Sequence, residues 1–170
     1  MNTMNYFELF NLPISLHNNN TEVLKKYYAL CKQNHPDNYT LQNEDAQLKA
    51  EEMTAMINQA KKVLDDPQLR LAYILRLHEQ IADDEKFQLP PAFLGEMMDI
   101  NEQLMELEFA PDVEAKEKVK QEIKDMEVSL FDEVKAFFEK DVLSIDDINS
   151  DQLKSYYYKR KYLDRILEKL

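Results

Sequence analysis

The stretch "CKQNHPDNYTL", residues 31–41, decides the fold because it places a rigid turn directly after a helical pattern. Pro36 disfavours helical geometry at the residue before it, so the preceding helix is predicted to end at His35. The sequence leaves the role of the turn open. His35 and Asp37 are compatible with a catalytic pair, a metal site, a helix stop or a docking surface.

The residues before this turn have the pattern of an amphipathic helix. Asn20 and Thr21 are both suitable N-cap residues for it. Its apolar residues follow the spacing i, i+3, i+4, i+7 and predict the buried face: Leu24, Tyr27, Tyr28 and Cys31. Its opposite side carries Lys25, Lys26 and Lys32.

A long helix is predicted after the turn, from near Asn43 to the breaker Asp65-Asp66-Pro67. Small alanines in its apolar seam would let the preceding helix lie close to it, as an antiparallel hairpin. A shorter helix then resumes in "QLRLAYILRLHE", residues 68–79. The seam of the long helix alternates by four and three residues: Ala46, Ala50, Met53, Ile57, Ala60 and Leu64.

The polar stretch "EQIADDEKFQLPP", residues 79–91, separates this hairpin from three further amphipathic patterns. The first begins at Pro91 and ends at "FAPD", residues 109–112, where Pro111 suits the first turn of the next helix. The predicted fold is therefore all-α: a helical hairpin in residues 1–78, a linker in 79–91 and an antiparallel three-helix bundle in 92–170. The three seams are Phe93, Met97, Ile100, Leu104, Leu107; Val119, Ile123, Met126, Leu130, Val134, Phe137; and Leu153, Tyr156, Arg160, Leu163, Leu167, Leu170.

Composition limits the classes of function. The single glycine disfavours hairpin-rich β structure, and the single cysteine excludes an internal disulfide and a cysteine zinc site. Without a signal-peptide pattern or a long apolar run, we expect a cytoplasmic protein. Residues 1–78 carry 8 Lys/Arg against 9 Asp/Glu, a net charge of −1; residues 79–170 carry 13 against 24, a net charge of −11. Because the second half repels phosphate backbones, nucleic acid is not an expected partner.

The sequence offers little support for enzyme chemistry. His17 and His78 have no companion at metal-ligand spacing. His35 and Asp37 are candidates for an acid/base pair in a small hydrolase, but no nucleophile adjoins them. Cys31 is on the predicted apolar stripe, and we interpret it as a buried core residue.

The first predicted bundle helix carries two features beyond its seam. Its carboxylates (Glu96, Asp99, Glu102, Glu106) resemble those of di-iron bundles, but such centres need Glu-x-x-His motifs and no histidine follows His78. Beside the seam, Leu94, Met98 and Met105 form a second apolar strip, flanked by Asp99, Glu102 and Glu106. Two interpretations remain: a wide core face, or an exposed strip whose methionines adapt to a partner.

Taken together, these motifs resemble the J-domain, in which an HPD turn lies at the tip of a hairpin with a basic first helix. The wider pattern resembles HscB-type co-chaperones of iron–sulfur cluster assembly over nearly the whole chain. The segments that carry this resemblance are "YFELFNLP" (6–13), "INQAKKVLDDPQLRLAYILRLH" (57–78) and "AFLGEMMDINEQLMELE" (92–108).

The resemblance implies two binding surfaces and no cofactor or metal. The first docks on a DnaK/HscA-type ATPase chaperone and stimulates its ATP hydrolysis; it comprises His35, Pro36, Asp37, Lys25, Lys26 and Lys32. The second binds an IscU-type iron–sulfur scaffold protein and comprises Leu94, Met98, Asp99, Glu102, Glu106 and Tyr162. A monomer or weak dimer that needs neither nucleic acid nor membrane is expected.

Two departures from the family pattern stand out. Gly95 occupies a position where the family often has a larger apolar residue, which weakens the strip and costs about 1 kcal/mol of helix propensity. The cysteine-rich zinc extension of some eukaryotic members is also absent. The alternatives are therefore a J-domain co-chaperone for a different client and, from another class, the His35/Asp37 hydrolase.

Overall fold

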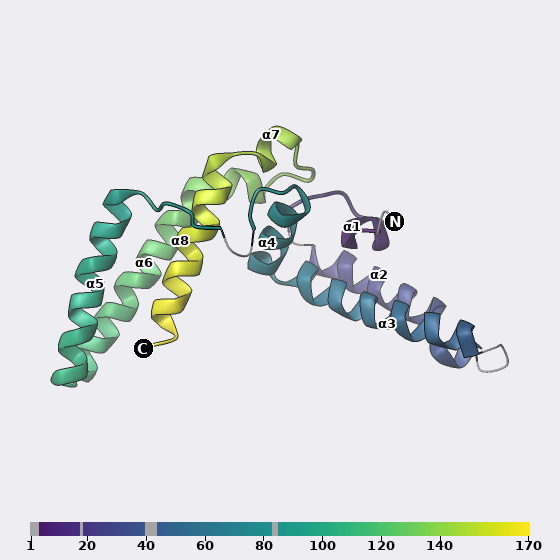
Figure 1. The fold of residues 1–170 in the computed structure, drawn as a ribbon, viewed down its shortest axis with the longest axis horizontal. Coiled ribbons are helices and arrows are strands. Elements are labelled where there is room, and N and C mark those ends of the chain that lie inside the picture. Colours follow the sequence, from purple (N-terminus) through teal and green to yellow (C-terminus); the bar gives the residue numbers. More distant parts are fainter. Residues whose placement is uncertain (1–3, 18, 40–43, 83–84) are drawn as a thin grey trace. The chain divides into compact units, whose positions relative to one another are not determined.

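The computed structural model describes residues 4–17, 19–39, 44–82 and 85–170 (Figure 1). Within these ranges every regular element is helical, so the all-α prediction is confirmed. The elements are α1 (Tyr6–Leu9), α2 (Asn20–Gln33), the 3₁₀ turn η1 (Pro36–Tyr39), α3 (Glu44–Asp65), α4 (Pro67–Leu77), α5 (Pro91–Phe109), α6 (Val113–Phe138), α7 (Ile145–Ile148) and α8 (Asp151–Leu167).

The chain divides into two compact units. The first unit comprises residues up to Leu77 together with 137–144, and the second comprises 78–136 together with 145–170. The return of 137–144 to the first unit has no counterpart in the sequence-based division at 79–91.

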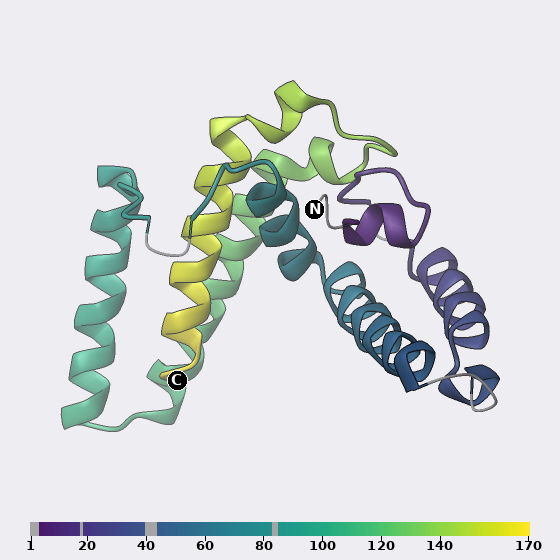
Figure 2. The same ribbon diagram turned by 45° about the vertical axis from the view of Figure 1, so that its right-hand side comes forward.

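The first unit is built around the predicted hairpin of α2 and α3, which lie side by side in both views (Figures 1 and 2). The alanine-containing seam of α3 faces the core, where Ile57, Ala60 and Leu64 are completely buried. Small side chains at such positions let the helices approach closely. The predicted break at Asp66 and the shorter helix α4 are confirmed as well.

The predicted buried face of α2 is wrong in part. Val23 is the residue of α2 that is fully buried, whereas Leu24 and Tyr28 are 41% and 64% exposed and Cys31 is half-buried. The physical reason is that α3 covers a narrow face of α2, so a four-residue apolar stripe is wider than the contact. The N-cap is also one residue earlier than predicted: the Asn19 side chain accepts a hydrogen bond from the Glu22 amide.

The second unit contains the predicted bundle of α5, α6 and α8 (Figure 1). Residues from all three seams meet in its core, among them Ile100, Ile123 and Leu163 with no exposed surface. The start of α6 differs from the prediction, because Pro111 lies before the helix. Asp112 caps it instead, through Oδ1, which accepts hydrogen bonds from the amides of Glu114 and Ala115.

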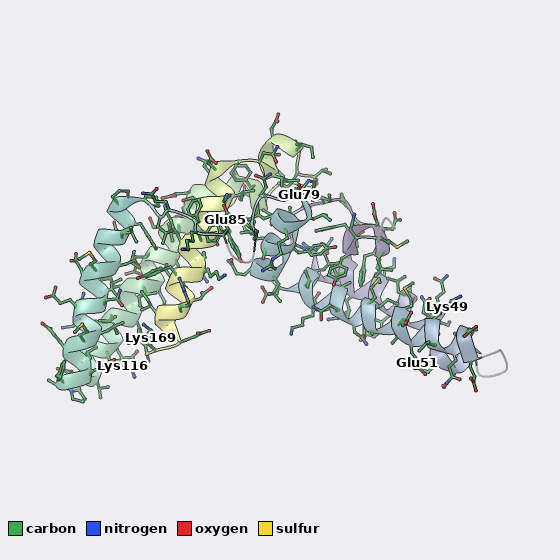
Figure 3. All side chains as sticks on the ribbon, viewed as in Figure 1. Lys49, Glu51, Glu79, Glu85, Lys116 and Lys169 are labelled. Carbon is green, nitrogen blue, oxygen red and sulfur yellow. The ribbon has the colours of Figure 1, made fainter. Side chains whose placement is uncertain are left out.

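The segment before α5 is attached to α8 within the second unit. The Glu85 carboxylate forms an ion pair with Lys154 and accepts a 2.9 Å hydrogen bond from the Tyr158 hydroxyl. Phe87 stacks on the Tyr158 ring, with centroids 4.6 Å apart and planes 7° apart. Glu85 therefore lies against the side of α8 (Figure 3), and the chain enters α5 from a fixed position.

The return segment 137–144 completes the first unit. The Ser15 hydroxyl donates a 2.7 Å hydrogen bond to the Lys140 carbonyl, and the Leu143 amide donates one of 2.8 Å to the Ile14 carbonyl. Leu143 is buried. Residues more than 120 positions apart along the chain thus form one compact unit.

Candidate functional site

The predicted docking turn is a tight structure at the end of α2. The helix stops at Gln33, two residues before the predicted end at His35, and residues 36–39 form η1. The Asn38 amide donates a 2.9 Å hydrogen bond to the His35 carbonyl, and the Asp37 amide donates one of 3.2 Å to His35 Nδ1. These bonds set the backbone between His35 and Asp37.

Polar side chains attach this turn to both helices of the hairpin. Asn38 Nδ2 donates to the carbonyls of Lys32 and Gln33, at 2.9 and 3.5 Å, and so satisfies acceptors that the helix end leaves open. The Thr54 hydroxyl lies 3.2 Å from the Asn34 carbonyl and links the turn to α3. Sequence reasoning missed Asn38 and Thr54, because each bonds to a carbonyl several residues away along the chain.

The side chains of His35 and Asp37 point to solvent. His35 and Asp37 are 59% and 82% exposed, and His35 Nδ1 lies 3.6 Å from Asp37 Oδ2. Catalytic residues usually lie in a concave pocket that binds the substrate, whereas these two side chains lie exposed at a tip. A tip of this kind is accessible to another protein. Within the described ranges, no group of three His, Cys, Asp or Glu side chains is arranged to hold a metal ion.

The three predicted lysines of α2 separate into two kinds. Lys25 and Lys32 are exposed on the outer side of the helix, with the exposed Tyr28 between them. Lys26 instead donates a hydrogen bond to the Asn11 carbonyl and forms an ion pair with Glu22, Nζ to Oε1 at 3.3 Å. Lys26 therefore stabilises the connection before α2, and the cations available at the surface are Lys25 and Lys32.

Cys31 has a structural setting next to the α2–α3 contact. The Cys31 thiol next to Tyr27 raises the pKa of the Tyr27 hydroxyl. The same hydroxyl donates a 2.9 Å hydrogen bond to Asn58, and the Lys61 ammonium lies 5.5 Å from the Tyr27 ring centroid. A hydrogen bond to Asp65 raises the pKa of Lys61, which keeps that lysine charged. These contacts join α2 to α3.

The second apolar strip of α5 is exposed, so its interpretation as part of a wide core face is wrong. The seam residues Phe93, Met97 and Ile100 are buried in the bundle, whereas Met98 and Met105 are 72% and 60% exposed. The bundle therefore packs without the strip, and the strip faces solvent. Its other predicted members are also exposed: Leu94 at 39%, with Asp99, Glu102 and Glu106.

Tyr162 of α8 lies half-buried beside α5. Its ring meets Phe93 edge-on, with centroids 6.0 Å apart, and Asn101 Nδ2 lies 3.5 Å from its hydroxyl. Tyr162 thus belongs to the contact between α5 and α8, at the edge of the strip. Gly95 is exposed on α5, and a Cβ added there would meet no atom within 4 Å.

Comparison with known proteins finds two families side by side along the chain. Residues 5–73 match the family described as "DnaJ domain", and residues 89–170 match "HSCB C-terminal oligomerisation domain". No helix among the described residues has the length and apolar character to span a bilayer.

Relatives and solved structures agree with these matches. A "Co-chaperone protein HscB homolog" of Vibrio cholerae serotype O1 is 39% identical over 113 residues, which is 66% of either chain; one of Shewanella amazonensis is 37% identical over 110 residues, 64% of this chain and 63% of its own. The matched part therefore spans about two thirds of these relatives' length. The crystal structure of human co-chaperone protein HscB has a TM-score of 0.79 at 27% identity and covers 99% of this chain and 81% of that one. The chaperone HscB of Vibrio cholerae has a TM-score of 0.61 at 29% identity, covering 98% and 99%.

Proposed function

The chain belongs to the HscB family of J-domain co-chaperones, and from that premise we propose that it couples an ATPase chaperone to an iron–sulfur scaffold. It activates a DnaK/HscA-type chaperone and brings an IscU-type scaffold protein to it as client. The ATP hydrolysis takes place in the chaperone, and this chain contributes binding surfaces. It acts in the cytoplasm as a monomer or weak dimer.

The observation that carries this proposal is the exposed, well-attached turn at the end of a helix with outward-facing lysines. A turn held by its own hydrogen bonds loses little conformational entropy on docking. The Asp37 carboxylate is placed to accept charge-assisted hydrogen bonds from an arginine of the chaperone. Lys25 and Lys32 would steer the turn towards an acidic surface. Lys26 supports the same helix from within.

The bundle supplies the second surface in this proposal. Exposed Leu94, Met98 and Met105 offer apolar area to the scaffold, and the carboxylates beside them select a partner with cationic groups. We assign activation to residues 1–78, a linker to 79–91 and client binding to 92–170. Two modest interfaces on one chain raise the concentration of the scaffold at the chaperone.

Single-turnover ATP hydrolysis by the chaperone tests the proposal. The rate is measured for the chaperone alone, with this protein, and with this protein plus the scaffold. We expect the rate to rise on addition of this protein and to rise again with the scaffold. An unchanged rate in both mixtures would refute activation, and turnover of small ester or amide substrates by the isolated protein would support the hydrolase instead.

A different client is a second candidate function, and Gly95 is the observation that favours it. The open space around Gly95 means that a scaffold complementary to a larger apolar side chain would lose contact there. Calorimetric titration with IscU-type scaffolds separates the two candidates. No binding at tens of micromolar, combined with intact chaperone activation, would establish that the client is another protein.

A further inference from the structure

The outer side of α8 carries three exposed cations next to the predicted scaffold-binding surface. Lys161 and Arg165 lie four residues apart on one side of α8, and Lys169 follows in the turn after the helix. They belong to the part of the chain, residues 79–170, whose net charge is −11. Cations in such an acidic region either pair with carboxylates of the same unit or are available to a partner protein.

Other cations of α8 have carboxylate partners within the second unit. Lys154 pairs with Glu85, Lys159 with Glu133, and Arg160 with Glu127 and Asp164. In the part of the chain that the structure describes, the contacts of Lys161 and Arg165 are instead with tyrosine rings. The positive charge of this row is therefore available to a carboxylate from outside.

Arg165 joins this row to the scaffold-binding surface. Its guanidinium carbon lies 5.3 Å from the centroid of the Tyr162 ring. Tyr162 in turn contacts Phe93 and Asn101 of α5, so Arg165 lies beside the residue that joins the two helices. Stacking on an aromatic ring holds a guanidinium in place while its N–H groups still point outward. A partner on this surface would therefore meet the guanidinium on the exposed side of Tyr162.

A groove continues the surface towards the end of the bundle. It has a volume of about 480 Å³ and an apolar floor that includes Leu104, Met105 and Leu170. Asn101, the neighbour of Tyr162, lines it on the α5 side. Lys169 and Lys116 lie on its rim, at the end of the bundle where α8 ends and α6 begins (Figure 3). Glu108 and Asp112 also line the groove, so it combines apolar side chains with charges of both signs, and its cations are Lys116 and Lys169.

We propose that Arg165, with Lys161 and Lys169, forms a cationic border of the scaffold-binding surface and binds carboxylates of an acidic and apolar segment of the scaffold, whose apolar side chain enters the groove beside Met105. This rests on the proposed function and adds to it. The surface then has opposite charges on its two sides: carboxylates of α5 beyond the methionines, and cations of α8 beyond Tyr162. Opposite borders orient a partner, because a reversed partner would face like charges on both sides.

Isothermal titration of an IscU-type scaffold protein tests this border. The variant Lys161→Glu/Arg165→Glu is compared with Lys124→Glu/Lys135→Glu, which changes the net charge equally at exposed positions of α6. We expect the α8 variant to raise the Kd about tenfold at low salt. This effect should shrink between about 50 mM and about 500 mM NaCl, while the α6 variant stays near wild type. Stimulation of the chaperone in the absence of scaffold should be unchanged in both.

Further variants separate this border from the proposed function. Arg165→Ala should bind the scaffold several-fold more weakly than wild type, whereas Lys124→Ala, which removes one exposed cation of α6, should bind as wild type does. Equal affinities for the α8 and α6 charge variants would overturn the cationic border and leave scaffold binding intact. A wild-type protein that fails to bind the scaffold would overturn the proposed client and the border together.

Discussion

At the scale of single residues, we expect Asp37 to matter for chaperone stimulation and to contribute little to the stability of the fold. It is 82% exposed at the tip of the hairpin, and its backbone amide contributes to the turn through His35. We predict that Asp37→Asn abolishes stimulation of the chaperone ATPase, because the amide is a weaker acceptor for a cationic partner. The melting temperature should change by less than about 2 °C, as expected for an exposed substitution.

Glu51→Gln is the matched control for this variant, since it removes one exposed carboxylate from α3, where Figure 3 labels it. It should leave stimulation near the wild-type rate. A large fall in the melting temperature of Asp37→Asn would contradict the prediction and show that the carboxylate is a structural cap.

Gly95 is the position in α5 where adding a methyl group should increase the stability of the helix. It lies in the interior of the helix, is exposed, and would accept a Cβ without any contact closer than 4 Å. Gly95→Ala should therefore raise the free energy of unfolding of the second unit by about 1 kcal/mol, through helix propensity and reduced chain entropy. Urea unfolding followed by circular dichroism measures the change. An unchanged or lower urea midpoint would mean that Gly95 has a role that the open space around it does not explain.

At the scale of elements, the turn after α2 depends on a side chain outside the HPD motif. The Asn38 amide group caps the last carbonyls of α2 through two hydrogen bonds. Asn38→Ala should lower the free energy of unfolding of the first unit by about 1 kcal/mol and reduce chaperone stimulation, because the turn is then less ordered before docking. Amide hydrogen exchange across residues 30–39 should accelerate selectively. Normal exchange with lost stimulation would instead show that Asn38 contacts the chaperone directly.

The segment that leads into α5 has a pH-dependent attachment. The ion pair with Lys154 and the hydrogen bond from Tyr158 lower the pKa of Glu85. A carboxylate with a lowered folded-state pKa stabilises the fold above its unfolded pKa, and this contribution is lost as the pH falls through the folded value. We predict that the melting-temperature difference between wild type and Glu85→Gln is largest near about pH 7 and shrinks towards about pH 3. A difference that is constant over this range would show that Glu85 acts through packing alone.

At the scale of the whole molecule, the two surfaces should fail independently. Met98→Ala/Glu102→Ala removes one apolar and one charged contact from the exposed strip of α5, and neither side chain belongs to the bundle core. We expect scaffold affinity to fall about tenfold or more, while stimulation of the chaperone without scaffold stays at the wild-type rate. Titration and single-turnover hydrolysis on the same preparations check both. Loss of both activities would contradict the division between residues 1–78 and 92–170.

Much of this molecule follows from local patterns in the chain. The proline at 36 ends α2, the breaker at 65–67 separates α3 from α4, and the heptad seams place Ile57, Ile100, Ile123 and Leu163 in the core. Such features are local because proline geometry and helical periodicity act within a few residues. The surface role of the HPD turn was predicted from the resemblance to the J-domain, whereas the sequence left the second strip of α5 open between core and surface.

The features that the sequence did not predict depend on which helices and segments pack against each other. Periodicity could not tell that α3 would leave Leu24 and Tyr28 exposed, that Lys26 would bind the Asn11 carbonyl, or that residues 137–144 would return to the first unit. The placement of Arg165 on Tyr162 is of this kind as well. The sequence by itself determined the main helices and their ends to within a few residues, because these depend on short-range geometry. Tertiary structure decided which faces of those helices are buried and which cations remain outward, because burial depends on residues far apart in the chain.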